Sequence, residues 1–106
     1  MQDVNLPLGR LIITTEVRRA IARSGTPLQE ILDRHRRGDW GMVDDFEAEE
    51  NDYAAEHGGM ITSVYWLPIG SVAWISTEGD RSKTYVILPT YPERDGSRSI
   101  RDGSRS

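Results

Sequence analysis

The sequence contains no cysteine and no long apolar run, and these two absences exclude several kinds of protein. Without cysteine there are no disulfides, no thiolate metal ligands and no cysteine nucleophile. No stretch approaches the ~18 apolar residues of a membrane-spanning helix, and the opening MQDVNLPLGR lacks the apolar region of a signal peptide. We therefore expect a cytoplasmic protein without a membrane segment.

Recognisable catalytic and cofactor motifs are also missing. The chain has two histidines, His35 and His57, and no phosphate-binding loop, dinucleotide fingerprint or zinc-ligand spacing. Both histidines fall on apolar stripes of expected helices, where a packed, hydrogen-bonded side chain is the ordinary role. We expect a non-enzymatic protein with no cofactor and no metal.

One loop leaves an enzymatic alternative open. The segment STEGDRSKT gathers acidic and basic side chains on an expected hairpin turn, namely Glu78, Asp80, Arg81 and Lys83. Together with His57, this cluster suggests a toxin-like RNase or nuclease. A solvated turn in which Gly79 supplies a positive φ explains the same segment, and we favour that interpretation.

The charge of the chain is unevenly distributed. The 106 residues suit one domain, and 37% hydrophobic with 28% charged residues is an ordinary globular composition. The net charge is −4, but residues 39–56 hold eight acids and no Lys or Arg, whereas residues 1–38 hold seven Arg against four acids. An acidic chain is a poor candidate for direct nucleic-acid binding, whereas a local acidic face suits a basic partner.

Two helices are expected in the first third of the chain. Residues 11–13 form a short apolar run that indicates a strand or an extended lead-in, and Thr15 then serves as the N-cap of a helix. The segment TPLQEILDRHRRG predicts a second helix. Thr26 would be its N-cap, Pro27 its first residue, and Gln29 the partner of Thr26 in a capping box.

These two helices allow two interpretations. As a helix-turn-helix they would place Arg34, Arg36 and Arg37 against DNA, which makes a small DNA-binding regulator an alternative function. As an ordinary αα-hairpin, they carry the arginines where cations complement a helix C-terminus. The hairpin is favoured, because bases are usually read from the N-terminal part of a recognition helix.

The segment VDDFEAEENDYAAEHGG predicts a third helix that ends at two glycines. Asp44 and Asp45 suit its N-terminus, where carboxylates are favoured by the helix dipole. Its apolar side chains share one stripe that Glu50 interrupts: Val43, Phe46, Tyr53, Ala54 and His57.

The remaining segments predict a small sheet. MITSVYWLP, SVAWIST and KTYVILP are β-rich runs separated by short turns, as in an antiparallel meander. The expected fold class is α+β, with two to three N-terminal helices packed on a three-stranded antiparallel β-meander. Residues 1–91 would form this single domain, and residues 92–106, which include both copies of the RDGSRS repeat, would form a flexible Arg/Ser/Gly tail.

The acidic segment permits mimicry of a nucleic acid. If residues 39–56 were wholly helical, the segment would be about 27 Å long, with one charge per roughly 3.4 Å, as in a single DNA strand. A solvated surface helix is the simpler interpretation. However, the segment contains no internal cation to offset the repulsion between its acids.

The motif GDWG, residues 38–41, joins the basic helix end to the acidic segment. Its glycines permit a sharp reversal, which would bring Arg36 or Arg37 close to Asp39, Asp44 or Asp45. A tryptophan in such a corner usually fills the space between helices and sheet. The alternative is that Trp40 is exposed and contacts a partner.

Four stretches of the sequence together resemble a group of small uncharacterised proteins of bacterial plasmids and integrative elements. They are LGRLIITTEVRRAI, RHRRGDWG, the acidic helix ending in HGG, and YWLPIGSVAWISTEGDRSKTYVILP. The resemblance covers about residues 8–91, and GDWG and TExDRS are its most specific landmarks. It implies a bacterial, mobile-element setting and supplies no catalytic residues.

The leading hypothesis is a protein that binds a host protein or ribonucleoprotein complex through its acidic helix. Masking a basic, nucleic-acid-binding surface in this way would make it an anti-CRISPR or antirestriction inhibitor. The expected partner contacts are Asp44, Asp45, Glu47, Glu49, Asp52 and Glu56, with Trp40 beside them. The sequence leaves the oligomeric state open.

Overall fold

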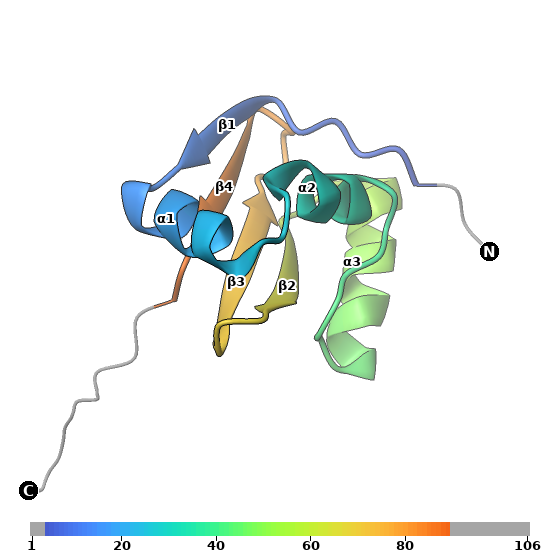
Figure 1. Cartoon of the computed structure of the whole chain (residues 1–106). Helices are drawn as coiled ribbons and strands as arrows, with labels where there is room; N and C mark the ends of the chain where they lie inside the picture. Colours follow the sequence, from blue (N-terminus) through green and yellow to red (C-terminus); the bar gives the residue numbers. More distant parts are fainter. Residues whose placement is uncertain (1–3, 90–106) are drawn as a thin grey trace, which may run out of the picture.

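The computed structural model describes residues 4–89, which form an α+β fold of three helices and one four-stranded sheet (Figure 1). The elements in chain order are β1 (Arg10–Ile13), α1 (Thr15–Ser24), α2 (Leu28–Arg36), α3 (Asp45–His57), β2 (Ile61–Leu67), β3 (Ser71–Thr77) and β4 (Lys83–Ile87). The tail predicted for residues 92–106 lies outside the described residues. None of the described helices is long and apolar enough to cross a membrane.

The sheet contains the predicted meander and one further strand. β2, β3 and β4 pair antiparallel in chain order, as their short turns require. β1 joins them by pairing parallel with β4, so the order is β1-β4-β3-β2 and the sheet is mixed. The three-stranded, purely antiparallel prediction was therefore wrong. A parallel pair between distant segments, such as Arg10 opposite Lys83, has no local turn signal in the sequence.

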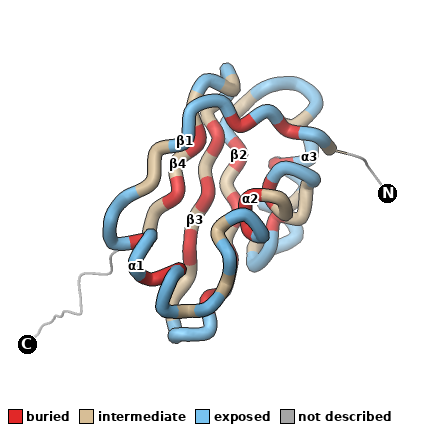
Figure 2. Tube along the Cα trace, turned by 45° about the horizontal axis from the view of Figure 1, so that its top comes forward, coloured by how far each residue is buried: buried red, intermediate tan, exposed pale blue. Residues whose placement is uncertain are grey.

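The core lies between one face of the sheet and the two helices α1 and α2 (Figure 2). Side chains alternate along β2 and β3, so every second residue is buried on this inner face. The buried side chains of the helices are Val17, Ala20, Ile21, Ile31, Leu32 and His35. They meet Ile61, Ser63, Tyr65, Leu67, Ala73, Ile75, Thr77, Thr84 and Val86 of the sheet. α1 and α2 thus form an αα-hairpin whose buried face is used for packing.

Two predicted helix caps are shifted. The N-cap of α1 is Thr14, one residue before the predicted Thr15, and its side-chain oxygen accepts a hydrogen bond from the Val17 N–H. The cap of α2 is Pro27, which has no side-chain acceptor, so the box predicted between Thr26 and Gln29 does not form. Proline fixes φ at the start of the helix, and it has no backbone N–H that would need an acceptor.

α3 begins later than the acidic segment does. The Asp44 carboxylate accepts from the Glu47 N–H at 2.8 Å, and the Glu47 carboxylate accepts from the Asp44 N–H at 3.1 Å. This capping box starts the helix at Asp45. Residues 39–44 are not helical, so the charge spacing of a wholly helical segment does not apply.

Candidate protein-binding surface

α3 lies alongside β2 at the edge of the sheet (Figure 1), where its middle is held by hydrogen bonds. The Asn51 side chain donates to the carbonyl of Thr62 at 2.9 Å and accepts from its N–H at 3.3 Å. This amide therefore satisfies the edge of β2 as a neighbouring strand would. The buried residues of the helix are Asn51 and Ala54, both small enough to allow a close approach.

Trp40 holds the same helix from the GDWG motif. The indole is 5% exposed, and its Nε1–H donates to Oδ1 of Asp52 at 2.9 Å. The ring also packs edge-on against His35, with the ring centroids 5.9 Å apart. The packing interpretation of this tryptophan is confirmed. Trp40 is therefore not exposed for contact with a partner, and the Asp52 carboxylate already accepts the hydrogen bond of its indole N–H.

The second glycine of the motif is required by a close backbone approach. Gly41 has a φ of 75°, and a Cβ there would lie 2.1 Å from the carbonyl oxygen of Val64. The backbone around it bonds to β2, because Met42 N–H donates to the Val64 carbonyl and Val64 N–H donates to that of Trp40. The motif thereby occupies the backbone hydrogen-bonding groups of Val64 at the edge of β2.

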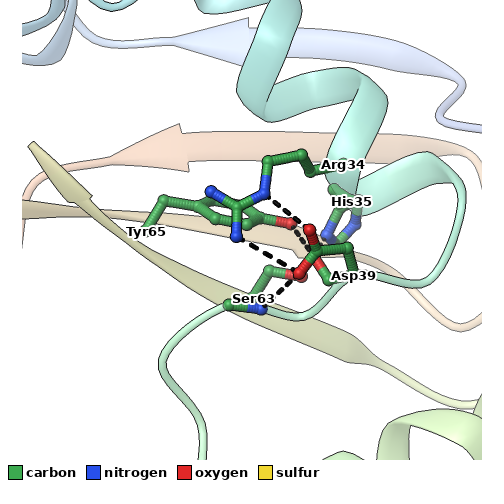
Figure 3. Close-up of polar contacts among 6 residues, drawn as sticks. Arg34, His35, Asp39, Ser63 and Tyr65 are labelled. Carbon is green, nitrogen blue, oxygen red and sulfur yellow. Dashed lines mark hydrogen bonds and ion pairs between the residues drawn. The ribbon is translucent and has the colours of Figure 1, made fainter.

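The contact expected between the basic helix end and Asp39 is made by Arg34, not by Arg36 or Arg37 (Figure 3). Arg34 donates from Nε and Nη2 to the two carboxylate oxygens of Asp39, at 2.7 and 3.2 Å. This bonding lowers the pKa of Asp39. The guanidinium also lies 4.7 Å from the ring centre of Tyr65, whose hydroxyl donates to the Asp39 carbonyl.

Arg81 secures the C-terminal end of α3. Its guanidinium donates to the carbonyl of Ala54 at 2.7 Å and to that of Gly59 at 2.8 Å. Ala54 lies in the last turn of the helix, where its carbonyl also accepts from the Gly58 N–H, and Gly59 lies just beyond the helix end. Arg81 itself has a φ of 63°, so the positive φ predicted for Gly79 belongs to the arginine. The TEGDRS motif thus supports the fold at the end of α3.

The carboxylates of that hairpin are occupied by neighbouring hydroxyls. Glu78 accepts from the hydroxyl of Tyr85, and Asp80 accepts from the hydroxyl and the N–H of Ser82. Within residues 4–89, no group of three His, Cys, Asp or Glu side chains could hold a metal ion. The acidic side chains of this hairpin therefore form hydrogen bonds within the hairpin itself.

His35 lies at one end of a buried chain of hydroxyl groups. The Leu8 carbonyl only accepts, so Thr84 donates to it, Thr77 donates to Thr84, and the Nε2–H of His35 donates to Thr77. Nδ1 is then the acceptor for the hydroxyl of Ser63, at 2.6 Å. The predicted packed role of this histidine is confirmed. Ser63 and His35 are both fully buried, so a substrate cannot reach them in this conformation.

α3 turns its largest apolar side chains toward solvent. Phe46 is 67% exposed and Tyr53 is 64% exposed, and His57 is also exposed, stacked on Tyr53 with ring centroids 4.0 Å apart. The predicted stripe that these residues share with Ala54 was wrong, because Ala54 is buried against the sheet side. The packed position predicted for His57 was wrong, because this side chain is exposed, although its Nδ1 donates to the carbonyl of Tyr53 at 3.0 Å.

The exposed face of α3 combines aromatic and acidic groups. Four residues line a shallow hollow of about 330 Å³: Phe46, Glu49, Glu50 and Tyr53. Their spacing of three, four and seven residues places them on one helical face. We call this set the outer stripe. It is the most exposed large apolar surface of the helix, and sequence reasoning missed its two aromatic members.

The six acids predicted as contacts are divided among different environments. Glu49 belongs to the outer stripe, and Asp45 is exposed in the first turn. Asp44 and Glu47 form the capping box, and Asp52 bonds to the buried tryptophan. Glu56 lies at a separate hollow with Pro7 and Arg81. The helix therefore does not present the six carboxylates as one row.

The fold and this surface define the class of molecule, a small α+β protein whose edge helix displays acidic and aromatic side chains. No protein-family model, curated protein sequence or solved structure matches the chain. The function is therefore inferred from the surface and its chemistry.

Proposed function

We propose that this is a non-enzymatic binding protein that docks through the outer stripe on a basic surface of a host complex. The observation that carries the proposal is the orientation of α3. Small and polar residues hold the helix against the sheet, while Phe46 and Tyr53 face solvent beside Glu49 and Glu50. Exposed apolar patches rimmed by polar groups are typical of protein-interaction sites, and aromatic side chains are enriched there.

The negative charge of residues 39–56 favours a positively charged partner. Residues 39–56 carry eight acids and no cation, so carboxylates three or four positions apart repel each other along α3. The ion pair from Arg34 reaches only Asp39, before the helix begins. A partner with arginines or lysines would relieve the repulsion and bind more weakly as salt is added.

The proposed setting is antidefence in a bacterial cytoplasm. The resemblance to proteins of plasmids and integrative elements favours a partner that such elements need to disable, namely a CRISPR effector or a restriction complex. These complexes bind DNA or RNA through basic surfaces. An acidic protein docked there would compete with the nucleic acid and act as an inhibitor.

The test is a binding panel of purified bacterial CRISPR effector and restriction complexes, immobilised and titrated with the protein. The wild-type protein should bind one complex and displace its DNA. A Phe46→Ser, Tyr53→Ser variant should bind at least about tenfold more weakly, because central aromatic contacts dominate interfaces. The matched control is Leu11→Ser, an exposed apolar residue on β1 at the opposite edge of the sheet.

Two results would contradict the proposal separately. If no complex in the panel binds the wild-type protein, the antidefence setting is wrong. If a complex binds wild-type protein and the aromatic variant equally well, the outer stripe is not the docking surface.

A further inference from the structure

The outer face of the sheet, opposite α1 and α2, is partly open to solvent. Strand alternation places Thr62, Val64 and Trp66 of β2 on this face, and Val64 lies opposite Trp74 of β3. Trp66 is 56% exposed, and the other three are half-buried. One flank of α3 borders this face, so the junction of helix and sheet has an apolar side and an acidic side.

A groove of about 360 Å³ runs along this junction. The side chains that define its character are Val43, Met60, Val64, Trp74, Glu47 and Glu50. We call it the edge groove. Its volume lies near the lower end of the ~300–1,000 Å³ found for ligand sites, and none of its lining residues is positively charged.

Both carboxylates of the edge groove keep acceptor capacity. Glu47 uses Oε1 to accept from the Asp44 N–H in the capping box, which leaves Oε2 for another donor. Glu50 makes no ion pair with any residue in the range 4–89. An apolar floor beneath two carboxylates fits an occupant that has an aliphatic stem and a cationic head.

We propose that the edge groove binds an arginine side chain presented by the protein partner. Arginine fits better than lysine, because its planar guanidinium stacks on an indole such as Trp74 and donates to carboxylates in a fixed fork. The inference rests on the proposed function, since the same partner would cover the adjoining outer stripe, with which the groove shares Glu50.

The partner cannot use this edge by adding a strand to β2. Asn51 occupies the free N–H and carbonyl of Thr62, and the backbone of Trp40 and Met42 occupies those of Val64. An extended chain therefore lacks the backbone partners that strand addition needs. Recognition at the edge groove proceeds by insertion of a side chain.

The experiment is an NMR titration of the full chain with a blocked Leu-Arg-Leu-Arg-Leu peptide, using as control the peptide in which citrulline replaces arginine. Citrulline keeps the shape of arginine and lacks its charge. The arginine peptide should shift the Trp74 indole N–H and the amides of Glu47 and Glu50. The citrulline peptide should bind at least about tenfold more weakly. The Trp74 indole signal is assigned by its absence from Trp74→Leu.

Glu47→Gln provides a second variant that preserves the fold, because glutamine also completes a capping box. It should weaken binding of the arginine peptide, whereas Glu16→Gln in the first turn of α1 should not. Equal binding of both peptides, shifts only at Phe46 and Tyr53, or no shifts at all would overturn the inference.

The two proposals fail in different ways. If the partner complex binds Glu47→Gln and Trp74→Leu as tightly as wild type but loses the Phe46→Ser, Tyr53→Ser variant, the edge groove is wrong and the proposed function stands. If the arginine peptide binds the edge groove and no defence complex binds the protein, the antidefence setting alone fails.

Discussion

At the scale of single residues, the buried imidazole of His35 links stability to pH. Burial lowers its pKa from 6.5 to about 4, and the positive charge of Arg81 contributes a smaller part. The unfolded chain takes up a proton near pH 6.5 and the folded protein only near pH 4. Stability from the neutral imidazole is thus fully present above pH 6.5 and is lost as pH falls toward 4. The total loss amounts to about 3 kcal/mol.

This dependence can be measured by urea unfolding across that pH range. The free energy of unfolding should fall as pH is lowered, and His57→Gln should keep the slope because His35 remains in place. In the folded protein, the imidazole carbon protons of His35 should not titrate until the pH nears 4. Titration of the folded protein near pH 6.5 would contradict the neutral, hydroxyl-bonded state.

Residue roles were predictable where they depended on local chemistry. A tryptophan between glycines indicated a packing corner, and the apolar stripe of the second helix indicated a packed His35, whereas the same argument failed for His57, which is exposed. The partners of those residues were not predictable. Asp52 for Trp40 and Ser63 for His35 come from segments that only the fold brings together.

At the scale of elements, α3 depends on a contact from the β3–β4 hairpin. Arg81→Met keeps the aliphatic stem and removes the bonds to the carbonyls of Ala54 and Gly59. Two carbonyls that lose a charged donor should cost about 1–3 kcal/mol of unfolding free energy. Amide hydrogen exchange in the last turn of α3 should become faster, whereas Lys83→Met, on the same hairpin, should leave it unchanged. Unchanged exchange in Arg81→Met would contradict the role of the arginine.

The existence of the elements was largely predictable, but their orientation was not. Periodicity and turn residues indicated three helices and the meander, because those signals are local. The orientation of α3 depends on hydrogen bonds between segments that are distant in the sequence. They join Asn51 to Thr62, Trp40 to Asp52 and Arg81 to Ala54. Acids surround the helix, so hydrophobic periodicity was a weak guide to its buried face. The small residues on that face were the signal that could have corrected the prediction.

At the scale of the whole molecule, the two landmark motifs converge on one helix. GDWG holds α3 through Trp40 and lines the neighbouring edge of β2, and TEGDRS holds its last turn through Arg81. The helices α1 and α2 and the inner face of the sheet form the core without the aromatic side chains of α3. The molecule therefore consists of a packed scaffold and a helix fixed at its edge. The sequence indicated an acidic surface, and the structure added its aromatic groups.

The central claim is that Phe46 and Tyr53 serve a partner and not the fold, and the free energy of unfolding tests it most directly. The Phe46→Ser, Tyr53→Ser variant should unfold in urea within about 1 kcal/mol of wild type, because both side chains are largely exposed. Tyr65→Ser, which empties a fully buried site, should lose about 3–5 kcal/mol. A loss in the double variant as large as that of Tyr65→Ser would place the aromatics of α3 in the fold and contradict the claim.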